Sequence, residues 1–531
     1  MSPGAGARAT RPVRAALVAA AALVAHAPAL RAGYILDDDT LLVSNPYVRT
    51  ASGLRVLLTS ELFLATARPE HAAQYRPVSA ALNWLSWQLL GGGPVAQHAL
   101  NLGMHAVVAV LLLVVLERAG VGPGVALVAA ALFAVHPATT MDVSYVEGRQ
   151  DLLGWALVLA SALAALQWRS WAAAGGAAFA ATLLAAHCRE PFVATFVGVA
   201  LLALVQGAAG RRICAAMLAG GAVAVGVTLG LRHAVGVTGY ESAPWSVGAA
   251  IEAAVAAGLR LARDVVLPTD LALQMTPSAL GPGLTALALA LFVAAAVAVD
   301  RVLARRSAAR RPVAWAAWVL MASQAAVYAI VVLQLGPISD RYAYGFVLAA
   351  SLLGASLAHA ALPALSPGGR RIAGFVSAGL TLATVPMTWA RAVTFRSEAT
   401  LQATMVQERP NDPETQIAEG LGLLSAGQLE AAQPHCAAYA SAHPRSDRAS
   451  LCIGLWQIQH GHSCDALPLV RPYALARPGY PRARQAALAA ALGCDDRPAV
   501  REMLAAWEPA FGGAQELVMA RRELDARENA P

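Results

Sequence analysis

The sequence predicts an all-α protein in two parts, a bundle of about eleven membrane-spanning helices followed by a stack of helical repeats. Two observations predict the bundle. Of the 531 residues, 57% are hydrophobic and only 13% are charged, and many segments reach the roughly 18–20 apolar residues that cross a bilayer core about 30 Å thick. A third observation, a 34-residue periodicity after the last apolar segment, predicts the stack.

Eleven apolar segments support the membrane part. They are 13–31, 95–116, 122–137, 152–167, 171–187, 191–208, 213–231, 283–299, 313–333, 343–361 and 372–389. We place the membrane part at residues 1–394 and the repeat part at 395–531, where the apolar segments end. For the first segment, a cleaved signal peptide is an open alternative, because "AHAPALRAG" offers small residues to a peptidase.

The positive charges predict the orientation. The chain has no lysine, so arginine supplies all 39 basic side chains behind the formal charge of +7. With the N-terminus inside, the cytoplasmic connections are short and basic, as the positive-inside rule expects. Their arginines are Arg8, Arg11, Arg14, Arg118, Arg169, Arg211, Arg212, Arg301, Arg305, Arg306, Arg310, Arg311, Arg370 and Arg371. We therefore predict a multi-pass protein of the cell (inner) membrane with periplasmic repeats, and no nucleic-acid partner.

The repeat part shows tetratricopeptide spacing. Four pairs of residues lie 34 apart: Gly420 and Gly454, Gly427 and Gly461, Ala432 and Ala466, and Pro444 and Pro478. The first glycine lets two helices approach, the second lies near the turn, the alanine packs in the second helix, and the proline ends the unit. A third unit, around 480–512, keeps the helical periodicity. The alternative is an alanine-rich bundle with chance glycines.

Four of the six cysteines lie in the repeats, and the repeat register favours two pairs. Cys436–Cys452 and Cys464–Cys494 would each join neighbouring helices at similar heights. Disulfides need an oxidising compartment, which agrees with repeats outside the cytoplasm. Four unpaired cysteines in the repeat cores are the alternative.

The connections on the outer face collect polar motifs. After the first segment comes "YILDDDTLLVSN", with Asp37, Asp38 and Asp39 in a row, followed by "YRP", "HALNLGMH", "HP", "GRQD", "CRE" and "DRYAY". Polar residues at a bilayer are costly and indicate function. The alternatives without a functional role are that the aspartates form a solvated linker and that the histidines are packed in the core. Histidines seven residues apart are not a recognisable metal-binding motif.

These motifs, their order and the trailing repeats resemble the transmembrane-and-tetratricopeptide-repeat (TMTC-type) O-mannosyltransferases and their bacterial relatives. That family consists of membrane glycosyltransferases of the GT-C fold. The resemblance implies a GT-C type membrane domain and a polyprenyl-phosphate sugar as donor. It further implies transfer of a hexose such as mannose to Ser or Thr hydroxyls of extracytoplasmic proteins, with the repeats holding the acceptor peptide.

The resemblance also implies the site. The family motif has two acids at the positions of Asp37 and Asp38; we expect Asp38 to be the general base and Asp37 its helper, which of them acts being open. Cations stabilise a phosphate leaving group, and arginine suits its geometry. The candidates on the outer face are Arg341, Arg149, Arg76 and Arg189, with His105 and His136 as further donor-site candidates. A divalent metal is an open alternative, and no metal ligand is predicted.

The sequence departs from the family in one motif. The family has "HPxHTEAV"; here Met141 stands at the position of the glutamate, with Asp142 shifted by one, and Thr139 replaces the second histidine. This predicts a difference in sugar or acceptor. Two rival functions remain open: a membrane-anchored repeat scaffold, and a lipid-linked sugar transporter or flippase, which usually shows inverted repeats.

Overall fold

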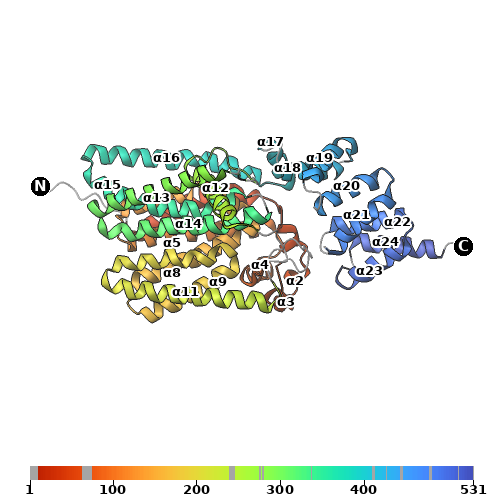
Figure 1. Ribbon diagram of the computed structural model, residues 1–531, viewed down its shortest axis with the longest axis horizontal. Coiled ribbons are helices and arrows are strands. Elements are labelled where there is room, and N and C mark those ends of the chain that lie inside the picture. The colour runs from red at the N-terminus through yellow and green to blue at the C-terminus, as the bar shows by residue number, and fades with distance from the viewer. Residues whose placement is uncertain are drawn as a thin grey trace.

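The computed structural model describes residues 10–62, 74–237, 245–273, 277, 280–335, 338–408, 413–425, 427–442, 447–476, 481–511 and 514–529. The regular elements of these residues are all helices, so the predicted all-α class is confirmed. Figure 1 shows two bodies along one long axis. A bundle of long helices has the N-terminus at its outer end, and a smaller stack of short helices lies at the opposite end.

The bundle contains long helices, shorter helices and connecting helices. The long ones are α5 (Pro94–Arg118), α8 (Arg149–Gln167), α9 (Trp171–Cys188), α11 (Ala208–Ala234), α13 (Gly281–Arg306), α14 (Arg311–Leu335), α15 (Tyr344–Ala361) and α16 (Pro367–Thr394). The shorter ones are α1 (Arg11–Ala25), α6 (Pro123–Ala134), α7 (Thr140–Ser144) and α10 (Thr195–Leu202). The connecting ones are α2 (Pro46–Arg49), α3 (Gly53–Thr59), α4 (Pro77–Leu90) and α12 (Val247–Val266).

The number of membrane crossings differs in detail from the expected eleven. Among the described residues, eight helices are long and apolar enough to cross a membrane by length and composition, or nine if one bent pair counts as a single span. The expected span 122–137 is the first helix of the bent pair, Pro123–Ala134; the chain then turns by 56° into the second helix, Pro137–Ser144. Pro137 lacks an N–H and cannot continue the helix before it. The chain is a multi-pass membrane protein.

The two remaining expected spans are helical but short. Residues Glu190–Gln206 form a short apolar helix, and α1 is extended by the 3₁₀ turn η1 (Ala27–Arg31). Helix rises of about 1.5 and 2.0 Å per residue give α1 and η1 together about 30 Å, the thickness of a bilayer core. Eleven crossings would place the N-terminus and the repeats on opposite sides, as their positions at opposite ends of the bundle suggest.

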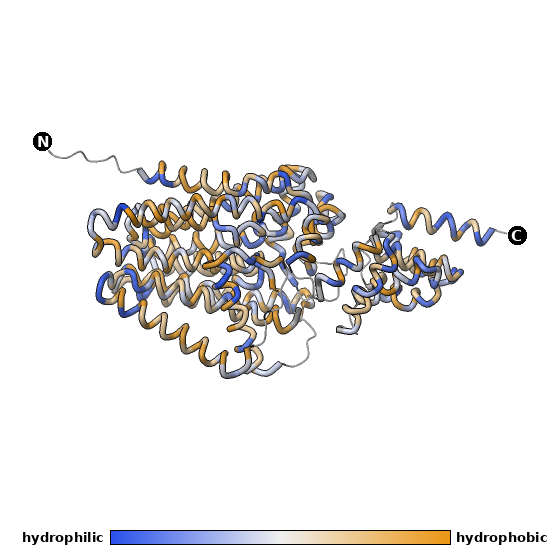
Figure 2. Tube along the Cα trace, turned by 90° about the horizontal axis from the view of Figure 1, so that it is seen from above, coloured by the Kyte–Doolittle hydropathy of each residue, from blue (hydrophilic) through white to orange (hydrophobic). Residues whose placement is uncertain are grey.

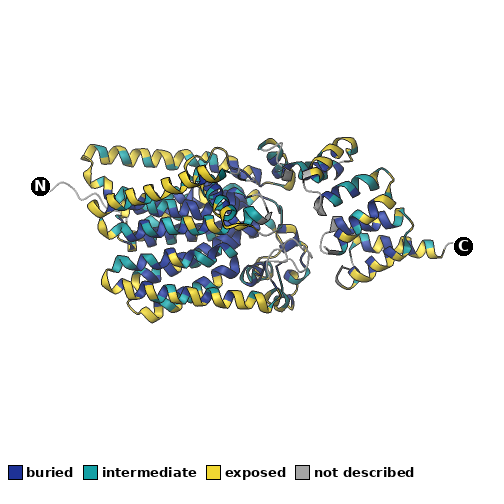
Figure 3. Ribbon diagram, viewed as in Figure 1, coloured by how far each residue is buried: buried dark blue, intermediate teal, exposed yellow. Residues whose placement is uncertain are grey.

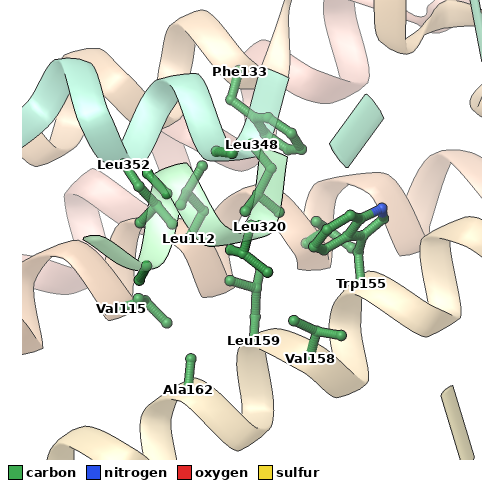
Figure 4. Close-up of a cluster of buried hydrophobic side chains, with 14 of the residues drawn as sticks. Leu112, Val115, Phe133, Trp155, Val158, Leu159, Ala162, Leu320, Leu348 and Leu352 are labelled. Carbon is green, nitrogen blue, oxygen red and sulfur yellow. The ribbon is translucent and has the colours of Figure 1, made fainter. Parts of the chain in front are cut away.

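Small and branched side chains form the core of the bundle. Figure 4 shows Leu112 and Val115 of α5 and Leu348 and Leu352 of α15 pointing toward one another beside Phe133. Alanines fill much of the remaining core, so the helices pack closely. Hydrophobic residues dominate the bundle throughout (Figure 2), and α16 lies at its edge with most side chains exposed (Figure 3). Such exposed apolar helix surface suits contact with lipid.

The repeat part has helix pairs with regular spacing. They are α18 (Pro413–Ser425) with α19 (Leu429–Ala442), α20 (Asp447–Gln459) with α21 (Ser463–Ala476), and α22 (Pro481–Gly493) with α23 (Arg497–Phe511), followed by α24 (Gln515–Glu528). The first helices start at 413, 447 and 481, a spacing of 34 residues. A helical repeat region is thus present. Its tetratricopeptide class and the domain boundary after residue 394, where α16 ends, stay predictions.

The glycines of the repeat have the expected surroundings. Gly427 and Gly461 have φ of 73° and 82° at the turns between paired helices, a conformation that favours glycine. A Cβ on Gly454 would lie 2.3 Å from Val470 Cγ1, so this position allows the helices to approach. The prolines Pro444 and Pro478 lie outside the described residues.

Both cysteine pairs of the repeats are joined. Cys436 bonds Cys452 and Cys464 bonds Cys494, with Cα–Cα distances of 5.6 and 4.9 Å. This is the pairing that the repeat register favours. Cys188 and Cys214 are free and buried in the bundle.

Candidate active site

The three aspartates lie in what we call the acid loop, residues 32–45, between η1 and α2. Asp38 is fully buried. Its Oδ2 accepts hydrogen bonds from the backbone N–H of Ile35 (3.2 Å) and Val146 (3.3 Å), and its Oδ1 from that of Glu147 (2.9 Å). Burial and the Glu147 carboxylate raise the pKa of Asp38 well above its ordinary value, while the three N–H groups act in the opposite direction. Asp38 therefore attaches the acid loop to the connection before α8.

The other two aspartates face different surroundings. Asp37 is partly exposed, and its Oδ2 accepts a hydrogen bond from the Tyr145 hydroxyl at 3.4 Å. Asp39 is exposed and accepts from the Ser44 hydroxyl at 3.0 Å. Of the two acids that the family motif matches, Asp37 is the one that a substrate hydroxyl can approach in this conformation.

The acid loop is also bonded to the start of the repeat part. The N–H of Gly33 donates to the Arg396 carbonyl at 3.0 Å, and the N–H of Leu36 donates to Glu398 Oε2 at 3.0 Å. Leu36 has φ of 51°, a left-handed conformation that costs a non-glycine residue about 1–2 kcal/mol. These bonds help to hold that conformation next to Asp37. Glu398 begins α17 (Glu398–Glu408).

A tight connection before α8 carries the partners of the acid loop. Asn101 of α5 donates to the carbonyls of Tyr145 (2.8 Å) and Val146 (3.2 Å). Gly148 lies so close to Asp142 that a Cβ would meet its carbonyl oxygen at 2.2 Å. The "GRQD" motif therefore needs its glycine for close backbone approach, and the connection is fixed against α5.

Arg149 is fully buried in this connection. Its guanidinium donates to Ser86 Oγ (2.7 Å), to the Val146 carbonyl (3.0 Å) and to Asn101 Oδ1 (3.2 Å). With its donors used by neutral oxygens and no exposed surface, Arg149 holds the connection together in this conformation rather than facing a ligand.

Arg341 and Arg189 share one carboxylate, that of Asp151. Arg189 Nη1 lies 2.7 Å from both oxygens of Asp151, and Arg341 Nη2 lies 2.7 Å from Oδ2. Arg341 also donates to the Glu147 carbonyl at 3.1 Å, and its guanidinium lies 5.2 Å from the centre of the Tyr145 ring. The backbone of Glu147 thus donates its N–H to Asp38 and accepts from Arg341 at its carbonyl, so the acid loop and the arginines form one site.

Asp142 completes this charged group. Its carboxylate is fully buried, 3.7 Å from Arg341 Nε, and neither oxygen accepts a hydrogen bond within the described part of the chain. Met141, at the position of the family glutamate, instead packs in an apolar cluster with Ile35 and Tyr145.

Arg76 lies at the N-terminus of α4 and forms a second charged group. Its Nε donates to Glu190 Oε2 at 2.9 Å, and its Nη1 to Gln150 Oε1 at 2.9 Å. Arg232, at the end of α11, lies 3.4 Å from Glu190 Oε1. The Glu190 side chain is 31% exposed, against 4% for that of Asp151. This second group is therefore the more open of the two.

The candidate histidines are bonded within the fold. His105 has Nδ1 2.9 Å from the Tyr344 hydroxyl and Nε2 3.1 Å from the Ala134 carbonyl. His136 caps the turn η4 (Pro137–Thr139), with Nδ1 accepting from the Ala138 N–H, and its Nε2 lies 3.0 Å from the Val265 carbonyl. Both nitrogens of each ring are used, as in packed core histidines.

The structure thus brings Asp37, Asp38 and the four candidate arginines to one end of the bundle. Asp151, the acid of the "GRQD" motif, pairs with two of these arginines. The structure also adds residues that the sequence did not single out: Tyr145, Glu147, Arg232 and Arg391. Arg391, at the end of α16, contacts Asp340 Oδ2 at 2.8 Å and Glu408 Oε1 at 2.6 Å. An arginine at the end of an apolar segment usually extends its charged group to the membrane surface, so the sequence did not indicate a role for Arg391 in the site.

Within the described residues, no three His, Cys, Asp or Glu side chains are grouped as a metal ion would require.

Comparison with known proteins supports the resemblance. The human protein O-mannosyl-transferase TMTC1 (Homo sapiens) is 32% identical over 148 residues, 27% of this chain and 17% of that protein. TMTC3 of Mus musculus is 32% identical over 132 residues, 25% of this chain and 14% of that protein. Tmtc2 of Drosophila melanogaster is 28% identical over 202 residues, 36% of this chain and 21% of that protein.

The chain is therefore a relative of the TMTC-type proteins, as its motifs predict, but the match spans only about a fifth or less of the length of these relatives. No family model matches the chain, and no solved structure matches it.

Proposed function

We propose that this protein is a membrane glycosyltransferase that moves a hexose, mannose in the first instance, from a polyprenyl-phosphate carrier to Ser or Thr hydroxyls of extracytoplasmic proteins. One observation supports it above the others: a partly exposed carboxylate, Asp37, lies beside Tyr145, whose ring contacts Arg341. A proton acceptor and a cation are the two groups that displacement of a phosphate by a hydroxyl requires. The names of the relatives agree with this chemistry.

In the proposed reaction, the oxygen of the acceptor hydroxyl forms a bond to the anomeric carbon of the sugar, and Asp37 accepts the proton of that hydroxyl. The bond from that carbon to the carrier phosphate breaks, and its electron pair stays on the phosphate. Arg341 stabilises the negative charge that develops on the phosphate. Asp38, although it too matches the family motif, holds the loop that positions Asp37.

The orientation that we propose places this site outside the cytoplasm. The acid loop and the repeats lie toward one end of the bundle and the N-terminus lies at the other (Figure 1). Two disulfides in the repeats fit an oxidising compartment, and the arginine-rich connections fit the cytoplasmic side. In this arrangement the repeats offer a surface for an extended acceptor peptide next to the acid loop.

Asp37→Asn tests the proposal, with Asp39→Asn as its matched control. Both remove one negative charge from the same loop, but Asp39 is exposed and bonded only to Ser44 among the described contacts. With purified protein, a polyprenyl-phosphate mannose and an acceptor peptide, we expect Asp37→Asn to lower kcat by about 10²–10⁴-fold, the usual contribution of a general base. Asp39→Asn is expected to stay near the wild type.

Mass spectrometry of extracytoplasmic proteins from cells with and without this protein provides the second test. Loss of hexose from Ser or Thr in the deletion strain, restored by the wild type and not by Asp37→Asn, is expected. Unchanged glycosylation together with no transfer by the purified wild type would rule the proposal out and leave the repeat scaffold as the better description. Full activity of Asp37→Asn would instead exclude Asp37 as the base.

A further inference from the structure

Helix α17 contacts the reaction centre from the side of the repeat part. Figure 1 shows it at the junction of the two bodies, after the end of α16 and before α18. It has 11 residues, so it is about 16 Å long at a rise of about 1.5 Å per residue. Its first residue is Glu398 and its last is Glu408. Each of these acids binds a group of the bundle, so one short helix is tied to two places in the site.

The Glu398 end holds the acid loop. Glu398 Oε2 accepts the hydrogen bond from the N–H of Leu36 at 3.0 Å, and Leu36, with φ of 51°, directly precedes Asp37. Glu398 Oε1 accepts a second bond, from Gln402 Nε2 at 3.1 Å, one turn further along α17. Both carboxylate oxygens are therefore engaged, which restrains this exposed side chain. Because a left-handed residue redirects the chain, the bond to Leu36 helps to set where Asp37 lies beside Tyr145.

The Glu408 end holds the arginine side of the site. Glu408 Oε1 lies 2.6 Å from Arg391 Nη1, and the same guanidinium donates to Asp340 Oδ2 through Nε at 3.0 Å and Nη2 at 2.8 Å. Asp340 is buried and directly precedes Arg341, which donates to the Glu147 carbonyl. Glu408 thus acts on the backbone of Arg341 through one buried ion pair.

Apolar side chains between the two acids fasten α17 to the site. Leu401 and Met405 are buried in one cluster with Ile35 of the acid loop and with Tyr145, whose hydroxyl donates to Asp37. The four contact positions of α17, 398, 401, 405 and 408, recur at intervals of three, four and three, so they share one helix face. That face meets the bundle along the full length of the helix.

The same helix packs on the first helix of the repeat stack. A Cβ on Gly422 of α18 would lie 3.4 Å from Gln402 Oε1, and Gln402 is the side chain that binds Glu398. The element that fixes the acid loop is therefore itself supported by the repeats.

We infer that α17 positions both halves of the reaction centre. Glu398 orients the proposed base, Asp37, and Glu408 orients the cation, Arg341. This inference rests on the proposed function and adds two positioning residues to it, both supplied by the segment that leads into the repeats. Its physical basis is the steep dependence of rate on geometry, since a displacement of about 1 Å at a reacting group can cost about a hundredfold. The repeat part then completes the centre in addition to holding a peptide.

Variants of Glu398 test the base half. Glu398→Ala removes the acceptor of the Leu36 N–H, whereas Glu398→Gln keeps a carbonyl oxygen on a side chain of the same length. Glu430→Ala is the matched control, because it removes an exposed acid of α19 whose contact, His460, lies within the repeats. Transfer is measured on the purified full-length protein with a polyprenyl-phosphate mannose and an acceptor peptide, and the melting temperature of each variant is recorded alongside.

Glu398→Ala is expected to lower kcat by about tenfold or more and to leave KM for both substrates within about twofold of the wild type, because the base moves and the substrates do not. Glu398→Gln should restore most of kcat, and Glu430→Ala should match the wild type. In an Asp37→Asn background, Glu398→Ala should cost less than about twofold more, because a residue that acts through Asp37 then has no base to position.

Glu408→Gln tests the arginine half. It keeps the side-chain length and removes the charge that Arg391 meets on α17. We expect kcat to fall by about threefold or more in the wild-type background and by less than about twofold in an Arg341→Gln background.

The outcomes separate this inference from the proposed function. Wild-type activity in Glu398→Ala, equal losses in Glu398→Ala and Glu398→Gln, or losses that add in full to those of Asp37→Asn and Arg341→Gln would overturn the inference and leave the proposed function standing. Absence of transfer by the wild type would overturn the proposed function, and the inference with it.

Discussion

Arg391 is the residue whose replacement gives the clearest energetic prediction. Its guanidinium contacts the fully buried Asp340 through Nε (3.0 Å) and Nη2 (2.8 Å), and it reaches Glu408 of α17 at 2.6 Å. Arg391→Met keeps much of the side-chain volume but leaves the Asp340 carboxylate buried without its cation. Breaking one partner of a buried pair typically costs about 3–5 kcal/mol. The link from α16 to η9 (Asp340–Ala343) and to α17 is lost together with it.

The measurement is the apparent melting temperature of the purified full-length protein in detergent, with limited proteolysis between α16 and α17 as a second readout. Arg391→Met should melt earlier and be cut faster. The double variant Arg391→Met with Asp340→Asn should recover much of the loss, because no unpaired charge then remains buried. Arg396→Met, at an exposed arginine five residues later, is the matched control. A single variant that melts with the wild type would refute the reasoning.

Three further predictions follow from the structure. Burial raises the pKa of Asp264 to about 6, whereas the unfolded chain releases this proton near pH 4. The free energy of unfolding should therefore fall by roughly 1–3 kcal/mol as the pH rises from 4 to 6. Melting curves of Asp264→Asn over this pH range should lack that decrease. A Cβ on Gly220 would lie 2.2 Å from a backbone oxygen of α9, so Gly220→Ala should lower the melting temperature, at a cost of about 1–3 kcal/mol. A Cβ on Gly226, in the same helix, would meet nothing within 4 Å, so the control Gly226→Ala should be neutral or stabilising. Equal effects of the two substitutions would contradict this packing. The Cys436–Cys452 disulfide closes a 16-residue separation, so replacing both cysteines with serine should cost the repeats about 2–4 kcal/mol in denaturant titrations, and an unchanged midpoint would show that the bond contributes nothing.

Much of the fold could be predicted because apolar length and helical periodicity are local properties. Long segments such as 95–116 and 213–231 reappear as α5 and α11 with ends displaced by a few residues. The 34-residue spacing likewise located the repeats and the neighbours of each cysteine. The expected span 122–137 ends close to the break before Pro137; what composition did not show is that Pro137–Ser144 forms a further helix, bent by 56° from Pro123–Ala134.

The candidate site was harder, because burial is decided by segments far apart in the sequence. Asp37 and Asp38 are neighbouring residues of the same type, so the sequence does not distinguish them. In the structure, the backbone N–H groups of Val146 and Glu147 bind Asp38 and bury it, whereas Asp37 stays partly exposed. Likewise Arg149 and Arg76 both read as arginines of the outer face. Arg149 is enclosed by neutral oxygens, whereas Arg76 lies beside a partly exposed carboxylate.

The bonds between the acid loop and α17 have a consequence for how the protein is made. The amide of Leu36 and the carboxylate of Glu398 that accepts from it are 362 residues apart. At about 5–20 residues per second, a ribosome needs roughly 20–70 s to travel that distance. The aspartates thus leave the ribosome long before Glu398, and the acid loop reaches the conformation described above only after α17 has been synthesised. Until Arg396 and Glu398 have been synthesised, the acid loop lacks the two acceptors that hold the N–H groups of Gly33 and Leu36.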